Sequence, residues 1–144
     1  MTALDRALGA FYGLALGDAL GMPTQSLSRS QIQARFGEIT GLEDAGPDQP
    51  IAANMPKGSI TDDTEQAILV GQLLVEGQGN IQPAVLAKRL IEWEAVMQAK
   101  GSQDLLGPST KRAIEMILAT YESHRLGGPV EMPLKNRKHP LTLL

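Results

Sequence analysis

The chain has 144 residues, and 42% of them are hydrophobic, which is enough for one domain with a buried core. Aromatic residues make up only 3%, so aliphatic side chains must build that core, and this composition favours helices over strands. The formal charge of −3 is uneven, because residues 123–144 carry +3 and residues 1–122 therefore carry −6. An acidic body argues against nucleic-acid binding and is compatible with a site that collects cations.

The sequence contains no cysteine, which excludes disulfides and thiolate chemistry and fits a cytoplasmic protein. No secretory signal is visible. The apolar stretch at residues 8–21 is too short to span a bilayer, which takes about 20 apolar residues. We therefore expect a cytoplasmic protein with no membrane partner.

Residues 3–21 are predicted to form the first helix. Its apolar residues follow helical spacing: Leu4, Leu8, Phe11, Ala15 and Ala19. Glycines recur on it at every fourth residue: Gly9, Gly13, Gly17 and Gly21. Each interior glycine costs roughly 1 kcal/mol relative to alanine. We expect this glycine face either to pack closely against a neighbouring helix or to open onto a ligand.

Two segments follow before the next long helix. Residues 27–36 are predicted to form a short helix capped by Ser28 or Ser30. Residues 37–60 contain four glycines and three prolines, which predicts a long loop. Loops of this length in compact domains are often functional.

Three further helices are predicted, and the fold class is all-α, since no segment has the period of two that marks a strand. The first, residues 62–76, is expected to be mostly buried. The second starts at Pro83 and carries the apolar stripe Leu86, Leu90, Trp93 and Met97. The third runs from about Pro108 to Tyr121, with these residues inward: Ala113, Ile114, Ile117, Leu118 and Tyr121. After Tyr121 helical periodicity ends, and we predict an irregular tail, in which His124 and His139 are exposed.

The stretch "SITDDTEQ", residues 59–66, places two adjacent acids where a helix begins. Capping explains part of it, with Asp62 as N-cap and Glu65 three residues later, and acids in the first turn suit the helix dipole. The flanking threonines leave a second interpretation open, because two carboxylates and a Thr oxygen are hard ligands of the kind that Mg²⁺ or Mn²⁺ takes.

The chain contains, in this order, the segments "GAFYGLALGDALGMPTQ" and "GSITDDTEQA", then Trp93 and "DLLGPST". This order of motifs resembles the ADP-ribosylglycohydrolase family. The likeness covers residues 4 to about 120. It implies the N-terminal part of an all-helical bundle with a dinuclear Mg²⁺ or Mn²⁺ centre. It also implies that Thr61, Asp62 and Asp63 are metal ligands, with capping as an additional role.

The resemblance further implies hydrolysis of a glycosidic bond at the ribose C1″ of an ADP-ribosylated substrate or an ADP-ribose-like small molecule. Asp104 matches a position where the family tends to carry a functional Asp, and it is the catalytic candidate, with an ordinary loop acid as the alternative. Ser109 stands where a helix start could meet a phosphate, although Pro108 beside it is also normal helix-start chemistry. Asp18 either faces the site or makes an interhelix hydrogen bond.

Two features depart from the family. Gln25 stands where members commonly carry Glu; it can hydrogen-bond a ribose hydroxyl or a metal-bound water, but it cannot titrate. Members are also longer, and their second half carries an Asp-x-Asp-Thr-like motif that completes the metal centre. Because a hard cation takes about six oxygen ligands, Thr61, Asp62 and Asp63 alone form an incomplete site.

We therefore expect a truncated copy of a family member. Residues 1–122 would form the partial helical domain, and residues 123–144 would form an irregular tail unrelated to the family fold. Exposed helix faces would then favour self-association. The leading function is Mg²⁺-dependent ADP-ribosyl hydrolysis, impaired by truncation. The alternatives are an inactive fragment, a binding or interaction module, and half of a site that another chain completes.

Overall fold

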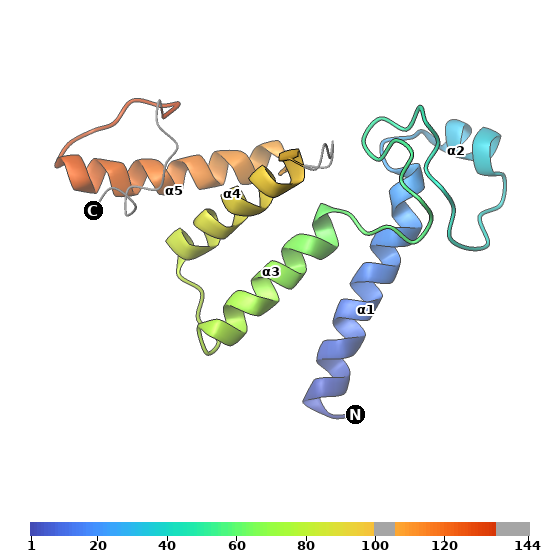
Figure 1. Ribbon diagram of the computed structural model, residues 1–144, viewed down its shortest axis with the longest axis horizontal. Helices are drawn as coiled ribbons and strands as arrows, with labels where there is room; N and C mark the ends of the chain where they lie inside the picture. The colour runs from blue at the N-terminus through green and yellow to red at the C-terminus, as the bar shows by residue number, and fades with distance from the viewer. Residues whose placement is uncertain (100–105, 135–144) are drawn as a thin grey trace. The chain divides into compact units, whose positions relative to one another are not determined.

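The computed structural model describes residues 1–99 and 106–134. In these ranges the chain forms five α-helices and one short 3-10 helix and has no strand, so the predicted all-α fold is confirmed (Figure 1). The chain divides into two compact units, Met1–Leu69 and Val70–Leu144. Within the described ranges no helix combines the length and the apolar character needed to cross a membrane.

The first unit begins with α1, Ala3–Gly21, which has the predicted bounds. Thr2 and Asp5 form a capping box at its start, which satisfies two backbone N–H groups that would otherwise lack a partner. The 3-10 helix η1, Met22–Thr24, continues it directly. The short helix α2, Arg29–Phe36, follows, and Ser28 caps it as predicted.

The apolar face of α1 has little packing within the described residues. Among its side chains Ala19 alone is buried, and Leu8, Phe11 and Leu16 are all exposed. A Cβ added at any of the four α1 glycines would meet no atom within 4 Å. The expected close packing of a neighbouring helix on this glycine face is therefore wrong for the described structure, and the open alternative remains.

The core of the first unit lies where the loop 37–60 folds over η1. Met22, Ala45 and Ala52 form a buried cluster there. Gln49 is also buried, at 3% exposure, and its side chain joins the loop to the residue that follows η1. Its Nε2 donates to the backbone oxygen of Gln25 at 2.9 Å, and its Oε1 accepts from the backbone N–H groups of Ile51 and Ala52.

Helix α3 spans Asp62–Glu76, as predicted, but it is not mostly buried. Of its described residues only Thr64 and Leu73 are buried, and the others are half-buried or exposed. The apolar run that follows the acids is therefore a partly exposed surface of the helix. Hydrophobic residues on a helix do not by themselves show which neighbour covers them.

The second unit is built on α4, Pro83–Ala99, which packs against α5, Pro108–Leu126 (Figure 1). Buried side chains there come from both helices and from Leu106 just before α5: Ala84, Ala87, Leu90, Leu106, Ile114, Leu118 and Ala119. Ala113, which was predicted to point inward, is exposed, and Leu106 at the start of the segment before α5 is buried instead.

Helix α5 continues to Leu126, so the predicted end near Tyr121 is wrong. An ion pair between Arg125 and Glu122, one helical turn apart, bridges the additional turn. Gly127 ends the helix in the left-handed conformation at φ +67°, and its N–H bonds back to the helix carbonyls. The extra turn carries mainly polar residues, which is why no apolar periodicity marked it.

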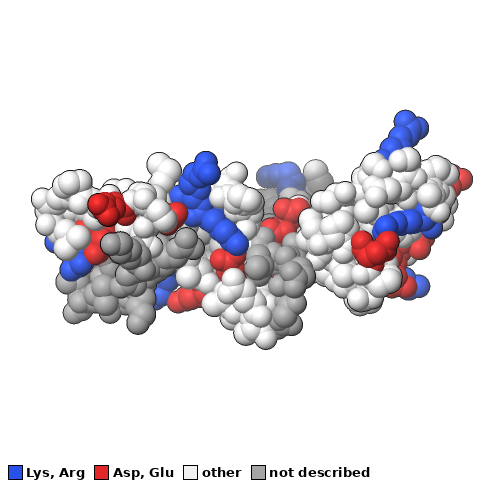
Figure 2. Space-filling view, turned by 90° about the horizontal axis from the view of Figure 1, so that it is seen from above, with Lys and Arg blue, Asp and Glu red and all other residues white. Residues whose placement is uncertain are grey.

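Many basic side chains are paired with acids. Five ion pairs join described residues: Arg35–Asp48, Lys88–Glu92, Arg89–Glu76, Lys111–Glu94 and Arg125–Glu122. Figure 2 shows basic side chains standing beside acidic ones on the drawn face instead of forming a continuous basic surface.

Candidate functional site

A cavity of about 400 Å³ lies in the first unit, beside the end of α1 and the start of α3. The glycine face of α1 forms one side of it through Gly13, Gly17 and Gly21. Because these residues lack side chains, α1 leaves space for a ligand at this point. The following polar side chains line the same cavity: Asp18, Gln25, Thr61 and Asp63. Three of the six predicted site residues, Gln25, Thr61 and Asp63, thus line one cavity together with Asp18.

Asp18 is the centre of the hydrogen bonding at this site. Its Oδ1 accepts from the Thr61 hydroxyl at 2.6 Å. Its Oδ2 accepts from the backbone N–H groups of Thr61 and Thr64, at 2.8 and 3.3 Å, and from the Thr64 hydroxyl. Thr61 and Thr64 are both buried. Asp18 therefore ties the end of α1 to the start of α3 across 43 residues of sequence.

The hydrogen bonds favour the charged form of Asp18. Burial by itself would raise the pKa of this carboxyl. The two hydroxyls and two backbone N–H groups of Thr61 and Thr64 outweigh burial, and together they hold the pKa of Asp18 below its ordinary value. Asp18 is therefore an ionised acceptor at neutral pH.

The start of α3 corrects the predicted capping. The helix begins at Asp62, and the Thr61 carbonyl accepts from Glu65 N–H at 3.2 Å, so the flanking cap position belongs to Thr61 and not to Asp62. Asp18 of α1 accepts from the first-turn N–H of Thr64 at 3.3 Å. Asp62 instead accepts from the Gln66 side chain at 2.8 Å. A cap supplied by another helix leaves no local sequence signal.

Gln25 presents an amide to the cavity. Its Nε2 is buried and has no hydrogen-bond partner among the described residues. Buried polar groups are almost always paired, so an orphaned donor in a cavity indicates a missing acceptor. Gln49 fixes the backbone behind it, through the bond to the Gln25 carbonyl. Sequence reasoning missed Gln49, because a single Gln within a long loop carries no signature of burial.

The donors in the cavity fit a hard divalent cation in type. Thr61 and Asp63 supply a hydroxyl and an exposed carboxylate, and hard cations prefer oxygen ligands. In number they are few: the described ranges contain no group of three or more His, Cys, Asp or Glu side chains arranged to hold a metal ion. An ion bound here would need further oxygen ligands from water, substrate or other chain segments.

Two further residues were predicted for the site, Asp104 and Ser109. Asp104 lies outside the described residues. Ser109 is exposed in the first turn of α5, in the second unit. Pro108 begins that helix, as expected from helix-start chemistry, and Gly107 occupies the cap position without a side-chain hydrogen bond. In the first unit Thr61, Asp63 and Gln25 line one cavity, and Ser109 belongs to the second unit.

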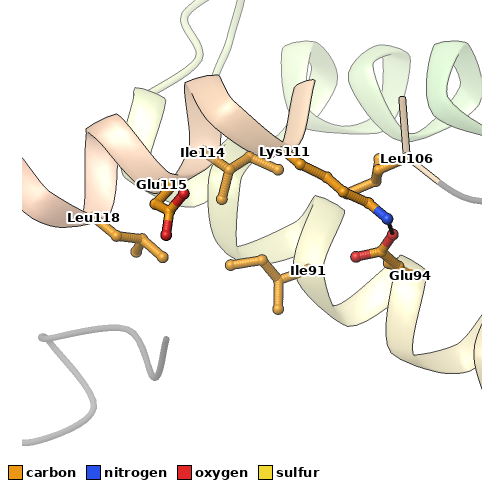
Figure 3. A pocket seen from close by; sticks show the side chains of 7 residues that line it. All are labelled: Ile91, Glu94, Leu106, Lys111, Ile114, Glu115 and Leu118. Carbon is orange, nitrogen blue, oxygen red and sulfur yellow. Dashed lines mark ion pairs between the residues drawn. The ribbon is translucent and has the colours of Figure 1, made fainter. Parts of the chain in front are cut away.

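A smaller cavity of about 80 Å³ lies in the second unit (Figure 3). Its walls are mainly apolar, from Ile91, Leu106, Ile114 and Leu118. Lys111 and Glu94 close one side with an ion pair of 2.8 Å. Glu115 accepts from the Leu134 N–H at 3.1 Å. These charged groups have partners within the protein, so this cavity does not show the unpaired donor seen at Gln25.

Comparison with known proteins decides the family. The family model described as ADP-ribosylglycohydrolase matches residues 1–135. The chain belongs to the ADP-ribosylglycohydrolase family. The match runs past residue 122, which was expected to end the family domain; the assignment of the segment 123–144 to an unrelated tail stays a prediction.

Individual relatives agree with the family match. The chain is 34% identical over 113 residues to the Escherichia coli protein YegU, covering 78% of this chain and 34% of that protein. It is 34% identical over 89 residues to the ADP-ribosyl-[dinitrogen reductase] glycohydrolase of Rhodospirillum rubrum, covering 62% and 28%. It is 32% identical over 115 residues to the ADP-ribosylarginine hydrolase Tri1 of Pseudomonas putida, covering 78% and 28%. The chain thus spans about a third of the length of the curated relatives it matches.

Proposed function

We propose that this member of the ADP-ribosylglycohydrolase family carries one side of a metal-dependent site that hydrolyses an ADP-ribosyl glycosidic bond. The supporting observation is that Thr61, Asp63 and Gln25 line the same cavity as the glycine face of α1. Two of the relatives are named for removing ADP-ribosyl groups, one from dinitrogen reductase and one from arginine. The substrate proposed for this chain is an ADP-ribosylated molecule or a small ADP-ribose-like compound.

The ion proposed for this site is Mg²⁺ or Mn²⁺, and it would be held by Thr61, Asp62 and Asp63. When bound, it would polarise water and orient the ribose hydroxyls. Asp63 offers an exposed carboxylate to the cavity, and Thr61 offers a hydroxyl oxygen. Asp62 directly precedes Asp63 on the same helical turn. Its Oδ2 already accepts from Gln66, so the Asp62 carboxylate would be shared between Gln66 and the ion.

Gln25 would bind the substrate and would not transfer a proton. Its orphaned Nε2 is a donor, and a ribose hydroxyl or phosphate oxygen would supply the missing acceptor. An amide does not titrate, so the general acid or base must be another group. Asp104 is the residue we propose for that step. In the reaction the bond between C1″ of the ribose and the leaving group breaks, the hydroxyl of water is added to C1″, and the leaving group takes the remaining proton of that water.

A binding module without turnover is the second candidate, and Gln25 favours it, since an amide in the cavity can bind a ligand but not catalyse proton transfer. A third arrangement, in which another chain supplies the remaining oxygen ligands, fits the small number of donors in the described ranges.

The test is turnover of ADP-ribosyl-arginine by the full chain with Mg²⁺ or Mn²⁺. We expect release of free ADP-ribose, and at least a hundredfold loss in Asp62→Asn and Asp63→Asn. Glu38→Gln is the matched control, because Glu38 is an exposed acid of the same unit that lies outside the cavity.

The result separates the candidates. Saturable ADP-ribose binding without turnover supports the binding module. Turnover that appears only when a second chain is added supports the shared site. Full turnover by Asp63→Asn would contradict the proposed metal ligands.

A further inference from the structure

Asp18 differs from Asp63 at the site because it already accepts four hydrogen bonds. Thr61 and Thr64 donate all four, one to Oδ1 and three to Oδ2. An ionised carboxylate has about four lone-pair positions, two on each oxygen, so Oδ2 has none to spare and Oδ1 keeps one. Asp18 lines the cavity as well, and its carboxylate holds both threonines there.

The bond at Oδ1 determines how Thr61 can act. A threonine hydroxyl has one proton and two acceptor lone pairs. The proton of Thr61 goes to Asp18 at 2.6 Å, which leaves the lone pairs for another partner. An oxygen whose proton is held by Asp18 has its lone pairs available to bind a positive ion.

The bonds at Oδ2 fix the backbone that carries the other acids. They hold the N–H groups of Thr61 and Thr64 at 2.8 and 3.3 Å, on either side of Asp62 and Asp63. Both threonines are buried, so this part of the first turn is anchored while Asp63 remains exposed.

We infer that Asp18 is a positioning residue of the metal site: through its hydrogen bonds it orients the Thr61 hydroxyl toward the ion and fixes the first turn of α3. The inference rests on the proposed function, because it requires that a cation binds at Thr61 and Asp63. It goes beyond the two open interpretations of Asp18, since one carboxylate both faces the cavity and makes the interhelix hydrogen bonds.

The test is a double-mutant cycle on Mn²⁺ affinity, measured by calorimetry with the metal alone. Asp18→Asn keeps the size of the side chain but places an amide donor against the Thr61 hydroxyl, which occupies a lone pair. Thr61→Val removes that hydroxyl. We expect each variant to weaken Mn²⁺ binding at least tenfold, and the double variant to be within about twofold of Thr61→Val alone, because residues that act through each other are not additive.

Controls separate positioning from charge and from folding. Glu38→Gln removes one negative charge from the same unit and should leave affinity within twofold. Thr61→Ser keeps the hydroxyl and should restore wild-type affinity. Thr64→Val leaves Asp18 and Thr61 unchanged but removes one bond to the same carboxylate, and should weaken Mn²⁺ binding two- to fivefold. This milder variant tests the inference even where Asp18→Asn does not fold.

Each outcome has a distinct meaning. Losses that multiply in the double variant, unchanged affinity in Asp18→Asn, or tighter binding in Thr64→Val would overturn the positioning role while leaving the metal site in place. No Mn²⁺ binding by the unmodified chain would overturn the proposed metal site itself, and the inference with it.

Discussion

The cavity beside Asp18 and the cavity beside Lys111 use charged residues in different ways. In the second unit, Lys111 and Glu94 pair with each other against an apolar wall. In the first unit, neutral hydroxyl and N–H groups donate four hydrogen bonds to Asp18, while Asp63 remains exposed and the Gln25 amide lacks an acceptor among the described residues. A cavity whose polar groups satisfy each other has no electrostatic need for a ligand. A cavity that leaves a carboxylate and a buried donor open offers binding energy to one.

The largest expected effect concerns Gln49, whose buried amide fixes the backbone of Gln25 in the wall of the first cavity. Gln49→Ala removes the bonds to the Gln25 carbonyl and to the Ile51 and Ala52 N–H groups. Unpaired buried groups cost about 1–3 kcal/mol each, so we expect the free energy of unfolding to fall by about 2–3 kcal/mol. Urea denaturation measures it. The exposed Gln33→Ala should change stability by less than about 0.5 kcal/mol, and equal effects would show that Gln49 has no special role.

The next prediction concerns the open amide of the first cavity. Gln25→Glu places a carboxylate beside Thr61 and Asp63, which adds a charged oxygen ligand for a cation. We expect Mn²⁺ affinity to rise about tenfold, equivalent to about 1.4 kcal/mol. Calorimetric titration measures it, with Gln31→Glu, on the exposed surface of α2, as control. Weaker binding in Gln25→Glu would mean that the cavity is not a cation site.

A pH series tests the hydrogen-bonded carboxylate of Asp18. The pKa of Asp18 is lowered in the folded state, so the unfolded chain binds its proton first as the pH falls. The stabilisation by Asp18 is therefore complete above about pH 4, the ordinary range of an Asp pKa, and is lost as the pH drops through the lower folded pKa. We expect the difference in thermal midpoint between the wild type and Asp18→Asn to shrink from pH 5 to pH 2. A constant difference would contradict the hydrogen-bonded, ionised Asp18.

The smallest expected effect belongs to the second cavity. Lys111→Met removes a partly exposed partner of Glu94, and such pairs contribute about 0.2–1 kcal/mol. We expect a fall of that size in the free energy of unfolding and no change in Mn²⁺ affinity. A change in Mn²⁺ affinity would mean that the two cavities are not independent, and would break the contrast between them.

Local signals predicted much of the secondary structure. The bounds of α1 and α3, the start of α4 at Pro83 and the cap at Ser28 all follow from periodicity and capping within a few residues. The end of α5 was also marked, because Gly127 followed by Pro129 is a normal stop, but the polar last turn obscured it.

Non-local contacts decided the site. The sequence by itself identified Thr61, Asp62, Asp63 and Gln25 as candidates, because their chemical types and order follow the family pattern. It could not show that Asp18 caps α3 across 43 residues, or that Gln49 is buried, since hydrogen bonds between distant segments leave no periodic trace. The chain therefore determined its helices through interactions between near neighbours. Only the tertiary structure determined that Asp18 accepts four hydrogen bonds while Asp63 is exposed, because that depends on the donors that folding brings to each carboxylate.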